Sequence, residues 1–145
     1  MSDASPHHTS PGQINPSNAR KVADFHRAIG RQLPGRPAVP DAAELAFRMT
    51  LLGEEMAEVQ QAAAELGDSL PGAQVADVFP LAHELIDLLY VTYGALLALG
   101  IDPDVAFAEV HRVNMHKVTG PRRADGKQLK PEGWRAADLR GVFEE

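Results

Sequence analysis

Two groups of carboxylates have a spacing that suits a metal-ion site. The first group reads E-E-x-x-E, at Glu54, Glu55 and Glu58, and the second reads E-x-x-D, at Glu84 and Asp87. Carboxylates three or four residues apart share one face of a helix. Where several converge between two helices, they repel one another unless cations lie among them. Because Mg²⁺ and Mn²⁺ prefer oxygen ligands, the pattern predicts a metal-dependent enzyme that acts on phosphates.

The second group is difficult to explain as a solvated helix face. Glu84 and Asp87 are the only acids between Val78 and Ile101, and leucine and isoleucine surround them. That stretch contains no lysine or arginine to pair with them, and burying unpaired charges costs several kcal/mol. A metal ion is the simplest partner. The first group, taken alone, would suit a solvated face equally well.

The residue types also restrict the metal. The sequence contains no Glu-x-x-His pair of the kind that di-iron bundles use, and His83 would be a single nearby imidazole. Cysteine is absent, which excludes thiolate zinc sites, disulfides and cysteine nucleophiles. An all-carboxylate shell favours Mg²⁺, with Mn²⁺ as a substitute.

Helices are the elements that must position these acids. A composition that is 44% hydrophobic but only 6% aromatic favours helices packed on helices. Periodicity and capping signals predict four of them, at about Ser17–Ile29, Asp41–Leu66, Pro80 to just before Gly100, and Asp102–Lys117. Residues 31–40 form a linker, and residues 67–79 form a loop or partly helical connection. Beyond Thr119, glycine, proline and charges exclude a long regular element.

The third helix is apolar nearly all round, which implies deep burial. A single chain with only four helices would leave part of this helix exposed, so we expect a homo-oligomer, at least a dimer. The predicted fold is therefore all-α, a four-helix bundle completed by homodimerisation, with an irregular basic C-terminal tail. We expect a disordered tail over residues 1–16 and one domain over residues 17–145.

The charge pattern narrows the partners. The net charge of −6 disfavours nucleic-acid binding, whereas residues 117–130 concentrate positive charge. Carboxylates plus a basic segment suit a polyphosphate. The polar N-terminus lacks the apolar core of a signal peptide, and the uncharged stretch Leu88–Ile101 is shorter than the ~20 residues that span a bilayer. We expect a soluble, cytoplasmic protein that binds no membrane.

The paired acidic motifs resemble those of the all-α nucleotide pyrophosphohydrolases of the MazG-like superfamily. That group includes dimeric dUTPases, MazG proteins, dCTP pyrophosphatases and phosphoribosyl-ATP pyrophosphohydrolases. The segments FHRAIG, LAHELIDLLYVTYGAL, FAEVHRVNMHK and GPRRADGKQLKPEGW are most similar to deinococcal MazG-like dUTPases. The similarity covers about residues 20–143.

The resemblance implies hydrolysis of a nucleoside triphosphate, with dUTP the expected substrate, to dUMP and pyrophosphate. It implies that the metal ligands come from Glu54, Glu55, Glu58, Glu84 and Asp87. One glutamate of the first group would activate water. We favour Glu55 as this base, and the adjacent Glu54 remains an alternative.

Substrate contacts are expected from several further residues. The resemblance places the Asn114 and Lys117 pair near the phosphates or the sugar. Cations of a flexible tail are candidate phosphate contacts, namely Arg122, Arg123, Lys127 and Lys130. Trp134 would either close over the site or anchor the tail. Phe25 or Tyr90 could stack on a pyrimidine and His26 could bond a uracil edge, although core packing explains these positions as well.

Three alternative functions remain open. A sister enzyme would use the same machinery on dCTP, another nucleoside triphosphate or phosphoribosyl-ATP. A non-catalytic helical dimer would bind nucleotide and metal as a sensor. A plain structural bundle, in contrast, predicts that divalent metal leaves the melting temperature unchanged.

Overall fold

The computed structural model describes residues 15–144, and within them the chain is helical, as predicted. The helices are α1 (Asn18–Ala28), α2 (Ala42–Ser69), α3 (Phe79–Ala98), α4 (Pro103–Met115) and α5 (Leu139–Phe143), with 3₁₀ turns η1 (Val75–Val78) and η2 (His116–Thr119). Over the described residues there is no strand, only an isolated bridge between Arg122 and Gln128. Residues 1–14 of the expected disordered tail lie outside the described residues.

Side-chain caps start the helices where the sequence predicts. The Ser17 hydroxyl accepts a bond from the Arg20 amide at 3.2 Å, and the Asp41 carboxylate accepts one from the Glu44 amide at 2.7 Å. Asp102 caps α4, whose first residue is Pro103. One boundary differs from the prediction, because α2 continues through Gly67 to Ser69. Glycine in a right-handed helical conformation weakens a helix without ending it.

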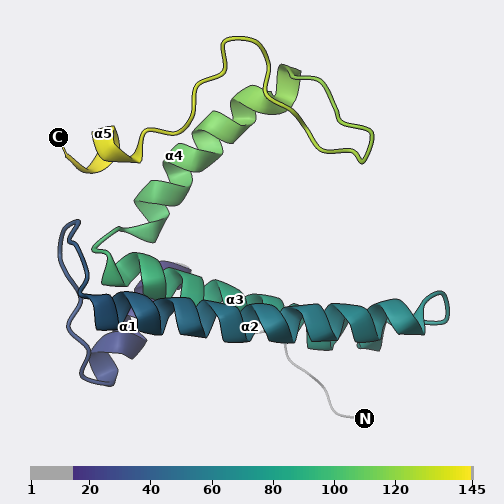
Figure 1. The fold of residues 1–145 in the computed structure, drawn as a ribbon, viewed down its shortest axis with the longest axis horizontal. Helices are drawn as coiled ribbons and strands as arrows, with labels where there is room; N and C mark the ends of the chain where they lie inside the picture. Colours follow the sequence, from purple (N-terminus) through teal and green to yellow (C-terminus); the bar gives the residue numbers. More distant parts are fainter. Residues whose placement is uncertain (1–14, 145) are drawn as a thin grey trace.

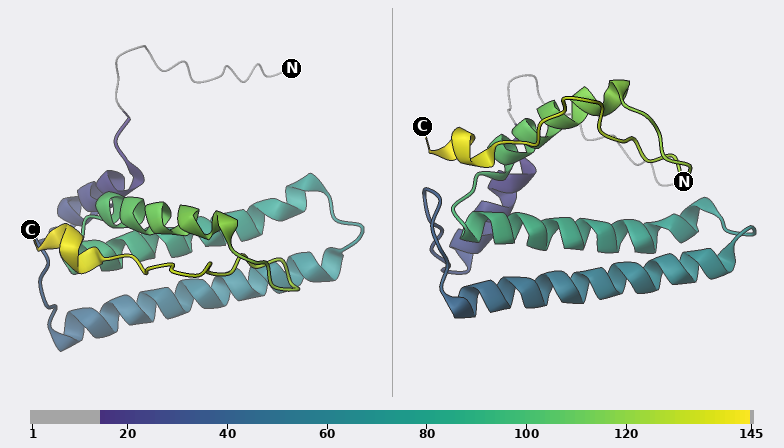
Figure 2. Two further views of the ribbon diagram at one scale, coloured as in Figure 1. Left: turned by 90° about the horizontal axis from the view of Figure 1, so that it is seen from above. Right: turned by 45° about the horizontal axis from the view of Figure 1, so that its top comes forward.

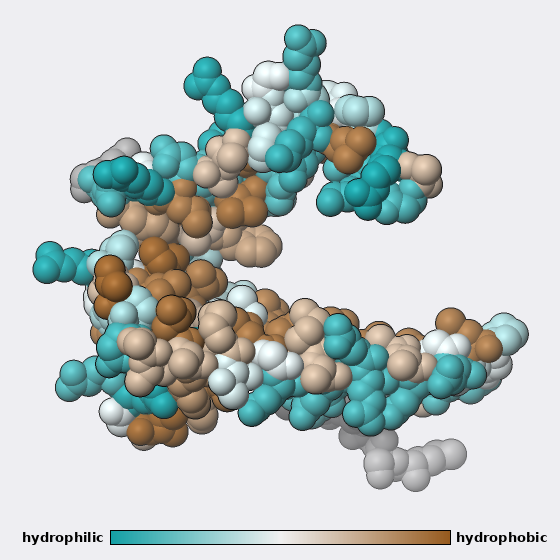
Figure 3. Space-filling model, in the orientation of Figure 1, coloured by the Kyte–Doolittle hydropathy of each residue, from teal (hydrophilic) through white to brown (hydrophobic). Residues whose placement is uncertain are grey.

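Helices α2 and α3 form a long antiparallel hairpin, and α1 packs against α3 (Figure 1). Helix α4 leaves the end of α3 and carries the rest of the chain with it. We call residues 103–144 the arm. In two views the far end of the arm lies clear of the hairpin (Figures 1 and 2). The space-filling view shows a hollow between them, with apolar surface at its closed end (Figure 3).

The buried core of one chain is small. Its buried apolar residues are Ala19, Val22, Ala23, Ala62, Ala98, Ala106 and Val113. Large apolar side chains of α3 are exposed instead, including Ile86 at 60% and Leu85 at 47%. Contiguous apolar surface of this kind marks an interaction site. The predicted four-helix bundle is therefore not closed within one chain, and its completion by a second copy stays a prediction.

One segment, Val75–Ala98, is long and apolar enough to cross a membrane by length and composition. Core helices of soluble proteins have the same character. Here the segment contains Glu84 and Asp87 and packs along α2 over much of its length. It therefore forms half of the helical hairpin.

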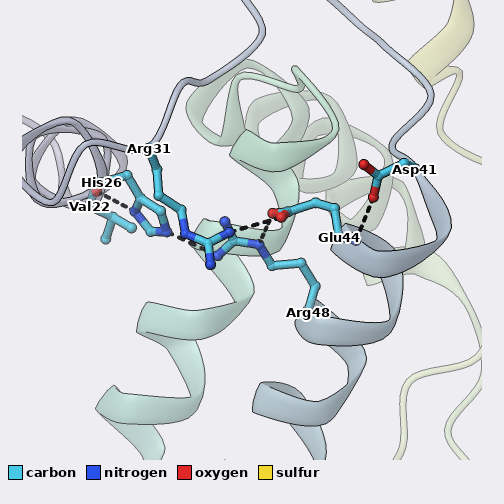
Figure 4. Close-up of polar contacts among 6 residues, drawn as sticks. All are labelled: Val22, His26, Arg31, Asp41, Glu44 and Arg48. Atoms are coloured by element: carbon cyan, nitrogen blue, oxygen red, sulfur yellow. Dashed lines mark hydrogen bonds and ion pairs between the residues drawn. The ribbon is translucent and has the colours of Figure 1, made fainter.

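A buried polar network joins α1 to α2 beside α3 (Figure 4). The Arg48 guanidinium, 5% exposed, bonds Nε2 of His26 at 3.0 Å and donates to Glu44 at 2.7 Å. The Glu44 carboxylate also accepts a hydrogen bond from Arg31 at 2.9 Å, so it points toward the arginines and not toward the backbone N–H of Asp41. Helix α3 approaches this network at Gly94, where a Cβ would lie 3.0 Å from Arg48 and 3.1 Å from His26. The network thereby sets how α2 lies against α3.

Candidate active site

The two acidic motifs meet between α2 and α3. Carboxylate oxygens of Glu55, Glu58 and Glu84 lie within 4.8 Å of one another. Glu55 and Glu84 are half-buried, and Glu58 is exposed. The hairpin brings them together because residues 55 and 58 share a face of α2, and position 84 follows the turn on the antiparallel α3. We call Glu55, Glu58 and Glu84 the carboxylate cluster.

Glu55 has the most unusual environment in the carboxylate cluster. Its Oε2 atom is buried and has no hydrogen-bond partner within the described chain. Burial raises the pKa of Glu55 above its ordinary value of 4.5, and repulsion from Glu58, Asp87, Glu84 and Glu54 adds to the rise. Buried polar atoms without partners are rare, and each requires an explanation such as a bound ion.

Glu84 is perturbed in the same direction. Partial desolvation raises the pKa of Glu84 most, followed by a side-chain hydrogen bond with Glu58 and repulsion from the same residue. Desolvation and a neighbouring carboxyl group both favour the uncharged form of Glu84, and a cation at this position would favour the charged form.

Asp87 and Glu54 lie at the edge of this arrangement. Asp87 contributes to the raised pKa of Glu55, but its carboxylate is 2.9 Å from Nε2 of His83, one helical turn away. Glu54 is exposed and also adds to the repulsion on Glu55. The structure thus brings Glu55, Glu58 and Glu84 into direct contact range and leaves Asp87 and Glu54 as charged neighbours.

The donor set fits a hard divalent cation. All the atoms of the carboxylate cluster that converge are carboxylate oxygens, which Mg²⁺ and Mn²⁺ prefer. A cation among them would satisfy the orphaned Oε2 of Glu55 and remove the repulsion that raises both pKa values. Nε2 of His83 contacts Asp87, and His83 is not among the residues whose ligand atoms converge.

The predicted phosphate contacts lie on the arm, apart from the carboxylate cluster. Lys117 and Lys130 lie near the Trp134 ring, and Arg122 bonds the Gln128 side chain at 3.2 Å. Arg123 pairs with Asp125 through two hydrogen bonds of 2.9 and 2.6 Å. Asn114 and Lys127 are exposed. Because the far end of the arm is clear of the hairpin in Figure 1, one chain as described does not place these cations beside the acids.

The predicted base contacts are engaged with one another. Phe25 contacts Tyr90 and His26 edge-on, each at a centroid distance of 5.7 Å. His26 is buried, and the Val22 carbonyl lies 2.8 Å from its Nδ1. With Arg48 at its other nitrogen, His26 has no free atom for a uracil edge. Phe25 and Tyr90 remain partly exposed, at 47% and 37%.

Sequence reasoning missed two polar contacts on the helices that carry the acids. The His83–Asp87 pair has the i, i+4 spacing that suits contact on a helix face, so the pattern alone could have indicated it. The contact between Arg48 and His26 joins residues that are distant in the sequence, and no local pattern indicates it.

Comparison with known protein families agrees with this geometry. The model of the phosphoribosyl-ATP pyrophosphohydrolase family matches residues 22–114, which is more than half of the chain and includes both acidic motifs. No curated protein matches the chain closely enough to count as a relative. The chain therefore belongs to the phosphoribosyl-ATP pyrophosphohydrolase family of all-α enzymes.

Proposed function

We propose that this protein hydrolyses dUTP to dUMP and pyrophosphate in a reaction that depends on Mg²⁺, with Mn²⁺ as a substitute. The observation that carries the proposal is the buried, unpartnered Oε2 of Glu55 at the centre of converging carboxylates. The role in the cell would be housecleaning of the nucleotide pool by a soluble, cytoplasmic enzyme.

The acids have two roles in this proposal. Glu54, Glu55, Glu58, Glu84 and Asp87 would hold the cation, Glu55 through its Oε2 atom, and the cation when bound would acidify and orient a water molecule. Glu55 also accepts the proton that this water loses. Burial is the largest cause of its raised pKa, and burial persists when the neighbouring charges are neutralised. Glu55 is therefore a stronger base than an ordinary surface glutamate.

The reaction balances with water as the only co-reactant. The water oxygen forms a new bond to phosphorus while the phosphoanhydride bond that releases pyrophosphate breaks. The proton passes to Glu55, and the electron pair of the broken bond stays on pyrophosphate. Cationic side chains stabilise that leaving charge, and on this chain they are those of the arm, including Lys117 and Lys130.

We propose that the working unit is a homodimer. The exposed apolar side chains of α3, including Ile86 and Leu85, support it. So does the arm, whose far end is separated from the hairpin by a hollow (Figure 3). Assembly would cover the apolar face and bring cations to the carboxylates, whether from the partner's arm or by closure of the chain's own arm.

A second substrate has a specific observation in its favour. The family model over residues 22–114 is that of phosphoribosyl-ATP pyrophosphohydrolases, so phosphoribosyl-ATP is a candidate for the same carboxylates. Residues 120–134, one of the four segments that resemble dUTPases, lie beyond that match. Both reactions release pyrophosphate, so the chemistry is common to them and only the substrate differs.

The test is pyrophosphate release from dUTP, dTTP, dCTP, UTP, dATP and phosphoribosyl-ATP, each with Mg²⁺, Mn²⁺ or chelator. Metal-dependent turnover that favours dUTP and yields dUMP supports the proposal. Turnover of phosphoribosyl-ATP instead moves the protein to the sister activity. If no substrate turns over although metal binds, the enzyme proposal fails and a nucleotide sensor becomes the better explanation.

A pair of variants on α2 sharpens this test. Glu55→Gln keeps the shape of the side chain and removes its basicity, so we expect kcat to fall by about 10²-fold or more. Glu65→Gln alters an exposed glutamate two to three turns away on the same helix, and its kcat should stay at the parent value. Equal kcat values for Glu55→Gln and the parent would exclude Glu55 as the base.

A further inference from the structure

The segment after η2 runs back along η2 and α4 and is tied to them in three places. The Gln128 amide donates to the Lys117 carbonyl at 2.7 Å, and the Trp134 indole donates to the Val113 carbonyl at 3.1 Å. The Asp138 backbone amide donates to the Glu109 carboxylate at 3.2 Å. Positions 109 and 113 lie in α4, and position 117 lies in η2. The basic segment is thus held at three points.

Trp134 forms the middle tether, and its indole N–H and its ring make different contacts. Its N–H donates to the Val113 carbonyl, which also accepts the backbone N–H of His116 at the end of α4. Its ring lies near two ammonium groups, with Lys130 Nζ 4.6 Å and Lys117 Nζ 5.1 Å from the ring centroid. An indole face attracts cations through its quadrupole. The ring therefore holds together two positive charges that would otherwise repel each other.

These two lysines have no acidic partner. Within residues 15–144, no carboxylate lies within ion-pair distance of Lys117 or Lys130. Two arginines of the same arm do have one, since Arg123 pairs with Asp125 and Arg112 pairs with Glu109, at 2.6 and 2.9 Å. Two ammonium groups that share one ring and lack a counter-charge are suited to an oligo-anion that reaches both.

We propose that Trp134 is a positioning residue that holds Lys117 and Lys130 as one binding site for the diphosphate group of a nucleotide or of pyrophosphate. The proposal rests on the proposed function for its choice of ligand. It differs from a lid, because the indole N–H is already bonded to Val113. The site belongs to the arm and needs no metal ion, so it binds pyrophosphate in the presence of chelator.

Trp134 is the only tryptophan in the chain, so its fluorescence reports this site directly. The experiment titrates the full-length protein with pyrophosphate in chelator at fixed ionic strength and follows the tryptophan emission. We expect a saturable change. Lys117→Met and Lys130→Met keep much of the apolar stem and remove the charge, so each should weaken binding by about tenfold or more. Lys21→Met, on α1, is the matched control and should leave the affinity unchanged.

Calorimetry with pyrophosphate then tests the tryptophan itself. Trp134→Phe keeps an aromatic face and loses the N–H, so it should retain most of the affinity. Trp134→Leu should lose about tenfold, as the lysine variants do. Should Trp134→Leu fail to fold, the comparison of Trp134→Phe with the two lysine variants decides the result. The lysine variants should keep the parent melting temperature, which separates positioning from mere stability.

Two results would overturn the proposal. One is an emission that does not saturate with pyrophosphate, and the other is unchanged affinity in both lysine variants. These outcomes are separate from the failure of the proposed function. A protein without turnover could still bind pyrophosphate on the arm, and an active enzyme could bind it only with metal at the carboxylates.

Discussion

The guanidinium of Arg48 donates a hydrogen bond to Nε2 of His26 across 3.0 Å, and both side chains are buried. The direction of this bond follows from the other ring nitrogen. Nδ1 lies 2.8 Å from the Val22 carbonyl, which only accepts, so Nδ1 carries the proton and Nε2 is free to accept from the arginine. The contact joins α1 to α2, and α2 carries Glu55 and Glu58.

Replacing Arg48 should therefore destabilise the fold. Arg48→Met would leave the His26 nitrogen buried without a donor and Glu44 with one cation fewer, so we expect a loss of about 2–3 kcal/mol in the free energy of unfolding. Urea denaturation measures it. Arg31→Met removes the more exposed cation of the same network and should cost less than about 1 kcal/mol. A smaller loss for Arg48→Met than for Arg31→Met would contradict this account.

Helix α3 approaches that network so closely at position 94 that we expect only glycine to fit there. A Cβ there would lie 3.0 Å from Arg48 and 3.1 Å from His26, both tied by hydrogen bonds. Gly94→Ala should therefore lower the melting temperature by several degrees. Gly67→Ala, at a position of α2 with no atom within 4 Å, should instead stabilise by up to about 1 kcal/mol. Thermal denaturation of both variants checks the contrast.

Glu55→Gln should separate stability from function. In metal-free protein the substitution removes a desolvated charge and its repulsion with four acids. We expect the melting temperature to rise by about 2–4 °C, the shift that ~1 kcal/mol gives at this size. In the parent, adding Mg²⁺ should raise the melting temperature by mass action. In the variant this increment should be much smaller, and an increment equal to that of the parent would show that metal binds elsewhere.

The raised pKa of Glu55 also predicts a pH dependence with a definite sign. The folded protein binds this proton more tightly than the unfolded chain, so metal-free stability should fall as pH rises from about 4.5 through the raised pKa. Glu109 acts oppositely, because the Arg112 hydrogen bond lowers its pKa. Subtracting the curve of Glu55→Gln from that of the parent isolates Glu55. A difference that stays constant from pH 4 to 8 would refute the assignment.

Assembly is predicted to depend on the exposed face of α3. Ile86→Lys places a charge on that face, where the parent side chain is 60% exposed in one chain. If a second copy covers it, sedimentation should show a shift to monomer. Val39→Lys changes an apolar residue that is 95% exposed in the linker, and it should leave the assembly intact. Equal masses for both variants would place the interface elsewhere.

The elements could be predicted from the sequence because local signals specify them. Asp41, Asp102 and Pro103 mark helix starts by short-range chemistry. The gathering of Glu55 with Glu84 also followed, because an antiparallel helical hairpin leaves few other ways to pair the motifs. The predicted end of α2 at about Leu66 is wrong, since Gly67 continues the helix and α2 ends at Ser69.

Contacts between distant elements could not be predicted in the same way. The Arg48–His26 bond depends on how closely α1 and α2 approach, which no periodicity encodes. The tethers of the basic segment depend on single side chains, Gln128 and Trp134, in a stretch without a repeating pattern. The position of the arm away from the hairpin is likewise a property of the three-dimensional packing (Figure 2).

The tethers at Glu109, Val113 and Lys117 have a consequence for the length of the chain. Successive attachment points lie four residues apart along η2 and α4, and the residues between Gln128 and Trp134 span one of these intervals while those between Trp134 and Asp138 span the other. A single inserted or deleted residue there would put Lys130 out of register with the indole. Insertions in the connection between α2 and η1, where no such spacing is imposed, should be tolerated far better.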